Sequence, residues 1–212
     1  MTRDRLRGLY AITPDVDDAQ ALAAKVRQAL EGGAKLVQYR NKTARHAERV
    51  VQARALLDLC HRFGVPMIIN DRVELALEVG ADGVHLGQDE LDIARARAVL
   101  GANSLIGASC YDSLERALEA ARAGADYVAF GSVFPSTTKP VAVRASLGLL
   151  AAAKRQIELP IAAIGGITSR NAALVIDAGA DLIAVISDLF HSDDISARAQ
   201  ALAQCFDKET QP

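Results

Sequence analysis

Short apolar runs recur along the whole chain at nearly regular intervals, and this rhythm constrains the fold more than any other feature. The runs are rich in Val, Ile, Leu and Ala, as are strands buried on both faces of a parallel sheet. Between them, apolar residues follow helical spacing, and Asp17 and Asp112 are predicted to cap two of these helices. Strands therefore alternate with helices, which is typical of an α/β fold. Eight runs occupy residues 9–13, 35–39, 66–70, 83–87, 104–109, 126–133, 160–166 and 181–187.

An internal repeat accompanies these runs. A Gly-Ala pair shortly before an apolar stretch occurs at Gly33, Gly80, Gly124 and Gly179, and successive copies are 47, 44 and 55 residues apart. Each glycine is predicted to end a helix in the left-handed conformation, so the copies precede the second, fourth, sixth and eighth strands. Alternate strands of a closed eight-stranded barrel contribute to the same interior layers and therefore share an environment.

This periodicity predicts one TIM barrel, a (β/α)8 fold, over residues 1–212, with its core at about residues 8–206. A doubly wound open sheet is the alternative.

Charge and cysteine content exclude several classes of protein. The 24 Lys and Arg residues nearly balance the 26 Asp and Glu residues, so the net charge is −2, without the basic excess of a nucleic-acid-binding protein. No apolar stretch is long enough to span a membrane, and we expect no secretion signal at the first residues. The number of cysteines is odd, and the spacing of Cys60, Cys110 and Cys205 does not match that of metal ligands. We therefore expect reduced thiols, a cytoplasmic location, and a monomer or homodimer that binds neither nucleic acid nor membrane.

Polar residues gather where the predicted strands end, which is the edge that carries the chemistry in parallel α/β proteins. Cations and amides bind phosphate oxygens, and carboxylates at strand ends hold Mg²⁺ together with a substrate phosphate. This first patch suits a magnesium diphosphate. It comprises Gln38, Arg40, Lys42, Asn70 and Lys139, with the carboxylates Asp71, Asp89 and Glu90.

A second patch follows the last two strands. Gly165 and Gly166 allow backbone N–H groups to approach an anion, and Ser187 follows the eighth strand. Two anion sites on one face indicate two phosphorylated reactants and hence a transferase.

Structural explanations remain open for single residues in these patterns. Asn70 and Asp71 could merely cap the next helix, and His85 is expected to be a hydrogen-bonded core histidine rather than a base. Cys110 is expected to be a small buried hydrophobe. No Gly-x-Ser-x-Gly elbow marks a nucleophile.

Seven motifs, taken in order and spacing, resemble the thiamine-phosphate synthase family. They are Gln-x-Arg-x-Lys at 38–42, Ile-Asn-Asp-Arg at 69–72, Gly-Ala-Asp-Gly-Val-His-Leu-Gly-Gln at 80–88, Ile-Gly-x-Ser at 106–109, Gly-Ser-Val-Phe-Pro-x-x-Thr-Lys at 131–139, Ile-Gly-Gly-Ile at 164–167 and Ile-Ser at 186–187. The resemblance implies a TIM barrel that joins hydroxymethylpyrimidine diphosphate to thiazole phosphate, giving thiamine phosphate and diphosphate. It implies a dissociative reaction assisted by Mg²⁺, in which diphosphate leaves before the thiazole nitrogen attacks.

The resemblance also implies roles for single residues. Arg40, Lys139 and Ser109 would be catalytic, and Asp71 would ligate Mg²⁺. The pyrimidine diphosphate would be held by Gln38, Arg40, Lys42, Asn70, Ser109 and Lys139. The thiazole phosphate would be held by Ser136, Thr138, Gly166, Ile186 and Ser187.

One departure from the family concerns the metal. The family pattern Gly-Gln-Glu-Asp reads Gly-Gln-Asp-Glu here, so Glu90 stands where the family has its second Mg²⁺ ligand, and Asp89 is the less favoured ligand. Two alternative functions remain, namely a thiazole tautomerase-like isomerase and a non-catalytic protein that binds thiazole phosphate or thiamine phosphate. Retention of Arg40, Asp71 and Lys139 favours the synthase.

Overall fold

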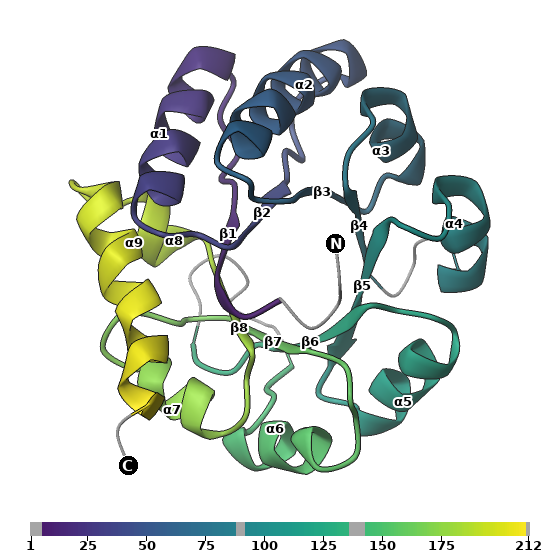
Figure 1. The fold of residues 1–212 in the computed structure, drawn as a ribbon, viewed down its shortest axis with the longest axis vertical. Helices are drawn as coiled ribbons and strands as arrows, with labels where there is room; N and C mark the ends of the chain where they lie inside the picture. The colour runs from purple at the N-terminus through teal and green to yellow at the C-terminus, as the bar shows by residue number, and fades with distance from the viewer. Residues whose placement is uncertain (1–5, 88–91, 136–142, 211–212) are drawn as a thin grey trace.

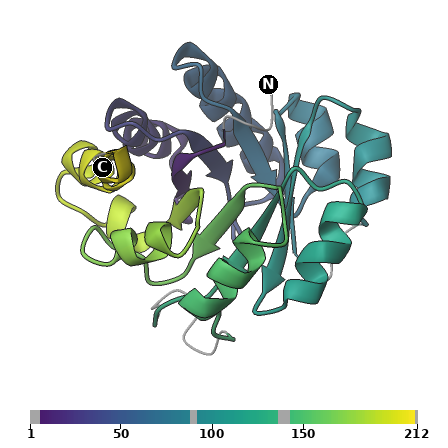
Figure 2. The ribbon, with the colours of Figure 1, turned by 60° about the horizontal axis from the view of Figure 1, so that its bottom comes forward.

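The fold is a closed barrel of parallel strands surrounded by helices (Figures 1 and 2). The structure is a computed structural model that describes residues 6–87, 92–135 and 143–210. The strands are β1 (Gly8–Ile12), β2 (Leu36–Tyr39), β3 (Met67–Asn70), β4 (Gly83–Leu86), β5 (Leu105–Tyr111), β6 (Tyr127–Gly131), β7 (Ile161–Ile164) and β8 (Leu182–Val185). The helices are α1 (Ala19–Glu31), α2 (His46–Arg62), α3 (Val73–Val79), α4 (Ile93–Leu100), α5 (Leu114–Arg122), α6 (Leu147–Lys154), α7 (Ala172–Asp177), α8 (Ser187–Phe190) and α9 (Ile195–Ala203), followed by the 3₁₀ helix η2 (Gln204–Thr210).

Pairing of the first strand with the last closes the sheet. Gly8 pairs with Leu182 and Ala11 with Val185, and every other strand pairs in parallel with its neighbours along the chain. The predicted barrel is thus confirmed, and the open sheet is excluded. Each predicted apolar run overlaps one strand.

Two helices begin one residue later than the sequence indicates. Asp18, not Asp17, caps α1 by accepting a hydrogen bond from the N–H of Ala21 (2.8 Å). Ser113, not Asp112, caps α5. A cap must reach an N–H two or three residues further on, so the side chain directly before the first helical turn takes the role.

The repeated Gly-Ala turns have the predicted backbone conformation. Gly33, Gly80, Gly124 and Gly179 all have positive φ, between 72° and 102°. The aspartate in three of these turns has a further use, because one carboxylate oxygen accepts the N–H of a residue at the start of the preceding strand. Asp82 binds Met67, Asp126 binds Ile106 and Asp181 binds Ile161, at 2.8–2.9 Å. These turns join successive strands at the amino end of the barrel.

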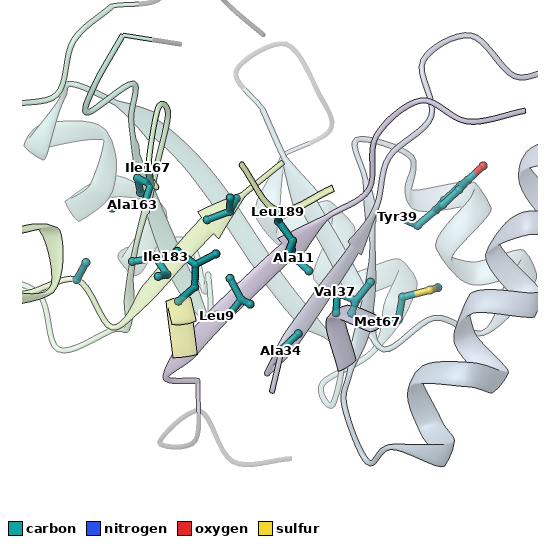
Figure 3. Close-up of a cluster of buried hydrophobic side chains, with 14 of the residues drawn as sticks. Leu9, Ala11, Ala34, Val37, Tyr39, Met67, Ala163, Ile167, Ile183 and Leu189 are labelled. Atoms are coloured by element: carbon teal, nitrogen blue, oxygen red, sulfur yellow. The ribbon is translucent and has the colours of Figure 1, made fainter. Parts of the chain in front are cut away.

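Alternation along the strands divides the core into two layers. One set of strand side chains packs against the helices, and Figure 3 shows Leu9, Ala11 and Val37 of this layer on β1 and β2. The other set fills the barrel interior, where Leu6 and Leu36 belong to an apolar cluster. Towards the carboxyl ends of the strands, polar side chains join this inner set. No helix in the described ranges has the length and apolar character that a membrane span requires.

Candidate functional site

A cavity of about 510 Å³ opens at the carboxyl ends of the strands. Its floor consists of inward-facing strand residues, and its rim consists of the loops that follow the strands. The structure brings together in this cavity most of the sequence-predicted site residues that it describes: Gln38, Arg40, Asn70, Ser109, Gly166, Ile186 and Ser187.

A second cavity of about 230 Å³ adjoins the first. Asn70 lines both cavities, while Lys42 and Asp71 line only the smaller one. Arg49 and Arg72 also line it, so three cations face a small space beside one carboxylate. Such a lobe suits a multiply charged anion together with a cation.

Asp71 stands at the end of β3 in a strained conformation. Its φ is 63°, the left-handed region that non-glycine residues rarely occupy. The conformation is held from two sides, since its N–H donates to the carbonyl of His85 (2.8 Å) and its Oδ2 accepts from Nδ2 of Asn70 (2.5 Å). The simple capping explanation is wrong, because Arg72 is the N-cap residue of α3 and its side chain makes no capping hydrogen bond.

The loop after β2 is tied to the loop after β1. Oδ2 of Asp15 accepts from Nη1 of Arg40 (3.1 Å), and Oδ1 of Asp15 accepts from the N–H of Lys42 (2.7 Å). The hydroxyl of Thr13 donates to the carbonyl of Arg40 and accepts from its N–H. The loop that follows β1 thus holds the guanidinium of Arg40 and the backbone of Lys42.

The glycine loop after β7 packs against the loop after β6. Gly165 and Gly166 have φ values of 103° and 62°. A Cβ at Gly166 would lie 2.3 Å from the carbonyl oxygen of Pro135, and one at Gly165 would lie 2.0 Å from Oγ of Ser132. Only glycine fits at these two positions, so backbone rather than side chain faces this side of the cavity.

A line of buried hydrogen bonds crosses the barrel beneath the cavity. Nε2 of Gln38 donates to Oη of Tyr10 (2.5 Å), which is 2.9 Å from Oη of Tyr127. Oη of Tyr127 is 2.8 Å from Nδ1 of His85, and Nε2 of His85 is 2.9 Å from Oγ of Ser109. We call these five residues the interior chain.

Tyr10, Tyr127 and the place of His85 in the cavity lining were not predicted from the sequence. His85 is buried and hydrogen-bonded, as predicted, but it also lines the cavity, as does Tyr10. Tyr127 resembled any aromatic strand residue. The available signal was the period of two, which places Tyr10 and Tyr127 on the inward faces of β1 and β6.

Cys110 is buried, as predicted, and burial raises the pKa of its thiol to about 12. It therefore remains a protonated thiol rather than a nucleophile.

The remaining predicted residues lie outside the described ranges. These are Ser136, Thr138 and Lys139 of the loop after β6, and Asp89 and Glu90 of the loop after β4. Within residues 6–87, 92–135 and 143–210, no three His, Cys, Asp or Glu side chains gather as a metal site.

Comparison with known proteins gives one consistent result. The family described as thiamine monophosphate synthase matches residues 9–189. A thiamine-phosphate synthase of Azoarcus sp. (strain BH72) is 56% identical over 203 residues, which cover 96% of this chain and 98% of that protein. One from Methylobacillus flagellatus is 56% identical over 209 residues, covering 97% of this chain and 100% of that protein.

Among solved structures, a thiamine phosphate pyrophosphorylase from Pyrococcus furiosus superimposes with a TM-score of 0.87. It is 37% identical, and the match covers 99% of both chains.

Proposed function

Since this chain belongs to the thiamine monophosphate synthase family and is a transferase that forms thiamine phosphate, we propose that its two adjoining cavities are where the two phosphorylated substrates meet. The observation that carries this proposal is the convergence of Gln38, Arg40, Asn70, Ser109, Gly166 and Ser187 on one cavity. Neither alternative, the tautomerase nor the binding protein, is favoured by relatives of this identity.

The smaller cavity is the proposed diphosphate site. Lys42 supplies charge inside it, Arg40 supplies charge from the adjoining larger cavity, and Asn70 lines both. We include Lys139 in this site because it ends the motif at residues 131–139. Because Asp15 and Thr13 hold the Arg40 loop before any substrate binds, the site is preorganised for the anion.

Asp71 fits the proposed role of a Mg²⁺ ligand. Mg²⁺ in proteins is commonly held by one or two carboxylates plus substrate phosphates, and the carboxylate of Asp71 lines the cavity proposed for the diphosphate. We propose Glu90, or less favourably Asp89, as the second carboxylate. Bound Mg²⁺ would neutralise charge on the diphosphate oxygens.

Gln38 and Ser109 lie on opposite sides of the cavity floor, on β2 and β5. We propose that they hold the pyrimidine end of the first substrate. The thiazole phosphate would lie against the other wall, at Gly166, Ile186 and Ser187, together with Ser136 and Thr138. The positive φ of Gly166 supports this site, because a left-handed glycine lets backbone N–H groups approach an anion closely.

The proposed reaction breaks the bond between the pyrimidine methylene carbon and the diphosphate oxygen. The electron pair leaves with diphosphate, and Arg40 and Lys139 stabilise the charge that builds there. The thiazole nitrogen then donates its lone pair to the methylene carbon, giving the thiazolium product. No protein nucleophile takes part, so the work of the site is positioning and electrostatic stabilisation.

The test is diphosphate release from the two substrates, with and without Mg²⁺. We expect release only when both substrates and Mg²⁺ are present. Arg40→Ala and Lys139→Ala should each lower kcat/KM by about 10²–10³, as removal of a single charge-stabilising donor does. Arg54→Ala, on the exposed face of α2, is the matched control and should leave the rate unchanged. Metal-independent turnover, or wild-type rates in Arg40→Ala, would contradict the proposal.

We also propose a cytoplasmic location, which the odd number of cysteines and the buried thiols of Cys60 and Cys110 support.

A further inference from the structure

The interior chain has a direction. We propose that its hydrogen bonds run from Gln38 to Ser109, place a proton on Nε2 of His85 and none on Nδ1, and so leave the hydroxyl proton of Ser109 to donate to an acceptor atom of the bound pyrimidine substrate. This inference rests on the proposed role of Ser109 in binding that substrate. It assigns positioning roles to Tyr127 and His85.

The direction is set at the Gln38 end. An amide nitrogen can only donate, so Oη of Tyr10 accepts from Nε2 of Gln38 (2.5 Å). A buried phenol proton needs an acceptor, and among the described residues Oη of Tyr127, 2.9 Å away, is the acceptor within reach of Tyr10; we therefore assign Tyr10 as the donor of this bond. Burial raises the pKa of Tyr10 and of Tyr127 above the usual range, so both hydroxyls keep their protons.

His85 transmits the direction to the cavity. Tyr127 uses its single proton to donate to Nδ1 of His85 (2.8 Å), which must therefore be the unprotonated nitrogen. A neutral imidazole with a bare Nδ1 carries its proton on Nε2, and that proton points at Oγ of Ser109 (2.9 Å). Oγ of Ser109 accepts this bond, so its own proton is directed away from His85.

Packing holds the three rings of the chain in place. The rings of His85 and Tyr127 stack with centroids 5.6 Å apart, and those of Tyr10 and Tyr127 meet edge to face at 6.0 Å. Gly107 faces the same interior as Ser109, two residues along β5. A Cβ at Gly107 would lie 2.1 Å from Cζ of Tyr127, so glycine there makes room for the phenol. Ring packing and the space at Gly107 thus hold the interior chain in place together with its hydrogen bonds.

The direction determines what Ser109 can recognise. The proton that Ser109 directs into the cavity binds an acceptor, such as a diphosphate oxygen or an unprotonated ring nitrogen. Tyr127 does not itself line the cavity, unlike Tyr10, His85 and Ser109. Any effect of its hydroxyl on catalysis must therefore pass through its neighbours.

The first test determines the tautomer of His85 in the wild-type protein. Long-range ¹H–¹⁵N correlation of the histidine side chains gives the tautomer of each ring, and loss of one set of signals in His85→Asn assigns His85. We expect a protonated Nε2 and a bare Nδ1. A protonated Nδ1, in the neutral ring or in an imidazolium, would overturn the proposal.

The second test asks whether Tyr127 acts through Ser109. Tyr127→Phe keeps the ring and removes the hydroxyl. We expect kcat/KM for the pyrimidine diphosphate to fall about tenfold and the His85 spectrum to change. In the Ser109→Ala background the same substitution should change kcat/KM by less than about twofold, because its route to the substrate is already lost. Equal effects in the two backgrounds would overturn the proposal, as would unchanged kinetics of Ser109→Ala.

Tyr39→Phe is the matched control, because it removes another buried phenol, one that donates to Oε1 of Gln52 (2.8 Å) outside the interior chain. Its His85 spectrum should match the wild type. Should Tyr127→Phe not fold, Tyr10→Phe interrupts the chain one step earlier and is subject to the same comparison. Failure of the proposed function itself would be distinguishable, because the wild-type protein would then release no diphosphate.

Discussion

Asp15 holds Arg40 through its Oδ2 and the N–H of Lys42 through its Oδ1. One carboxylate thus fixes both a guanidinium and the backbone of the loop proposed to bind diphosphate. The Arg40 side chain is mostly buried, with 14% of its surface exposed to solvent, whereas the Asp15 side chain is 36% exposed. Such a pair contributes modestly to stability, so its main consequence is the orientation of Arg40.

We predict that Asp15→Asn raises the KM for the pyrimidine diphosphate about threefold to fivefold. The amide oxygen can still accept from Lys42, whereas the charge that orients Arg40 is lost, and an exposed pair of this kind is worth up to about 1 kcal/mol. Asp17→Asn removes the same charge from the same loop and should leave KM unchanged. A lower KM in Asp15→Asn would show instead that Asp15 competes with the substrate for Arg40.

A second prediction concerns Gly107. Gly107→Ala should destabilise the protein by about 1–3 kcal/mol, because the new methyl group would overlap the ring of Tyr127. Gly148→Ala in α6 meets nothing closer than 3.7 Å and should instead be neutral or stabilising, since alanine favours a helix. Urea unfolding measures both. A Gly107→Ala variant as stable as the wild type would mean that Tyr127 can move aside.

Much of the architecture could be predicted from the sequence because it depends on periodicity. The apolar runs and the Gly-Ala turns at Gly33, Gly80, Gly124 and Gly179 are local patterns, and they predicted the number of strands and favoured a closed barrel over an open sheet. The exact helix starts were less predictable, since neighbouring residues such as Asp17 and Asp18 are both competent caps.

The site could be predicted where polar residues follow strands, as for Gln38, Asn70 and Ser109. The site could not be predicted from the sequence where a proposed positioning residue is an inward-facing aromatic side chain. Tyr127 has the same pattern as any core residue, and only the closed barrel places it between Tyr10 and His85. Asp15 was missed for a similar reason, because its partner lies 25 residues away on the next loop.

A third prediction concerns the ion pairs at the amino end of the barrel. Nη2 of Arg97 lies 2.5 Å from Oδ2 of Asp126, and the Asp126 side chain is only 6% exposed. Nζ of Lys154 lies 2.7 Å from Oδ1 of Asp181, whose side chain is 22% exposed. Arg97→Ala should lower the free energy of unfolding by about 3 kcal/mol because it leaves a buried carboxylate without its cation. Lys154→Ala should cost about 0.5 kcal/mol. Equal shifts of the two urea midpoints would contradict this ranking.

The cysteines give a fourth prediction. Burial raises the pKa of Cys60 and of Cys110 to about 12, whereas Cys205 is partly exposed. Near neutral pH a thiol reagent should therefore modify Cys205 rapidly and the other two only on unfolding. Mass spectrometry of the labelled native protein identifies the sites.

These thiols also predict a loss of stability at alkaline pH. Their folded pKa is above the unfolded value of 9.0, so their contribution is complete below about pH 9 and is lost as the pH rises towards 12. Tyr39, whose pKa burial raises to about 12, acts in the same direction. The unfolding free energy should fall over this range, and less steeply when Cys60 and Cys110 are both replaced by alanine. An equal slope in that variant would assign the loss to other groups.

The last prediction concerns the exchanged acids of the loop after β4. Successive side chains at a strand end generally point to opposite sides, so we expect only one of Asp89 and Glu90 to face the metal that we propose at Asp71. Glu90 occupies the family position, and its extra methylene adds reach. Glu90→Gln should raise the Mg²⁺ concentration for half-maximal activity at least tenfold, roughly 1.4 kcal/mol, and Asp89→Asn should change it little. The reverse result would make Asp89 the ligand. If neither variant shifts the Mg²⁺ dependence while Asp71→Asn does, both acids merely stabilise the start of the next helix, and Asp71 alone holds the metal.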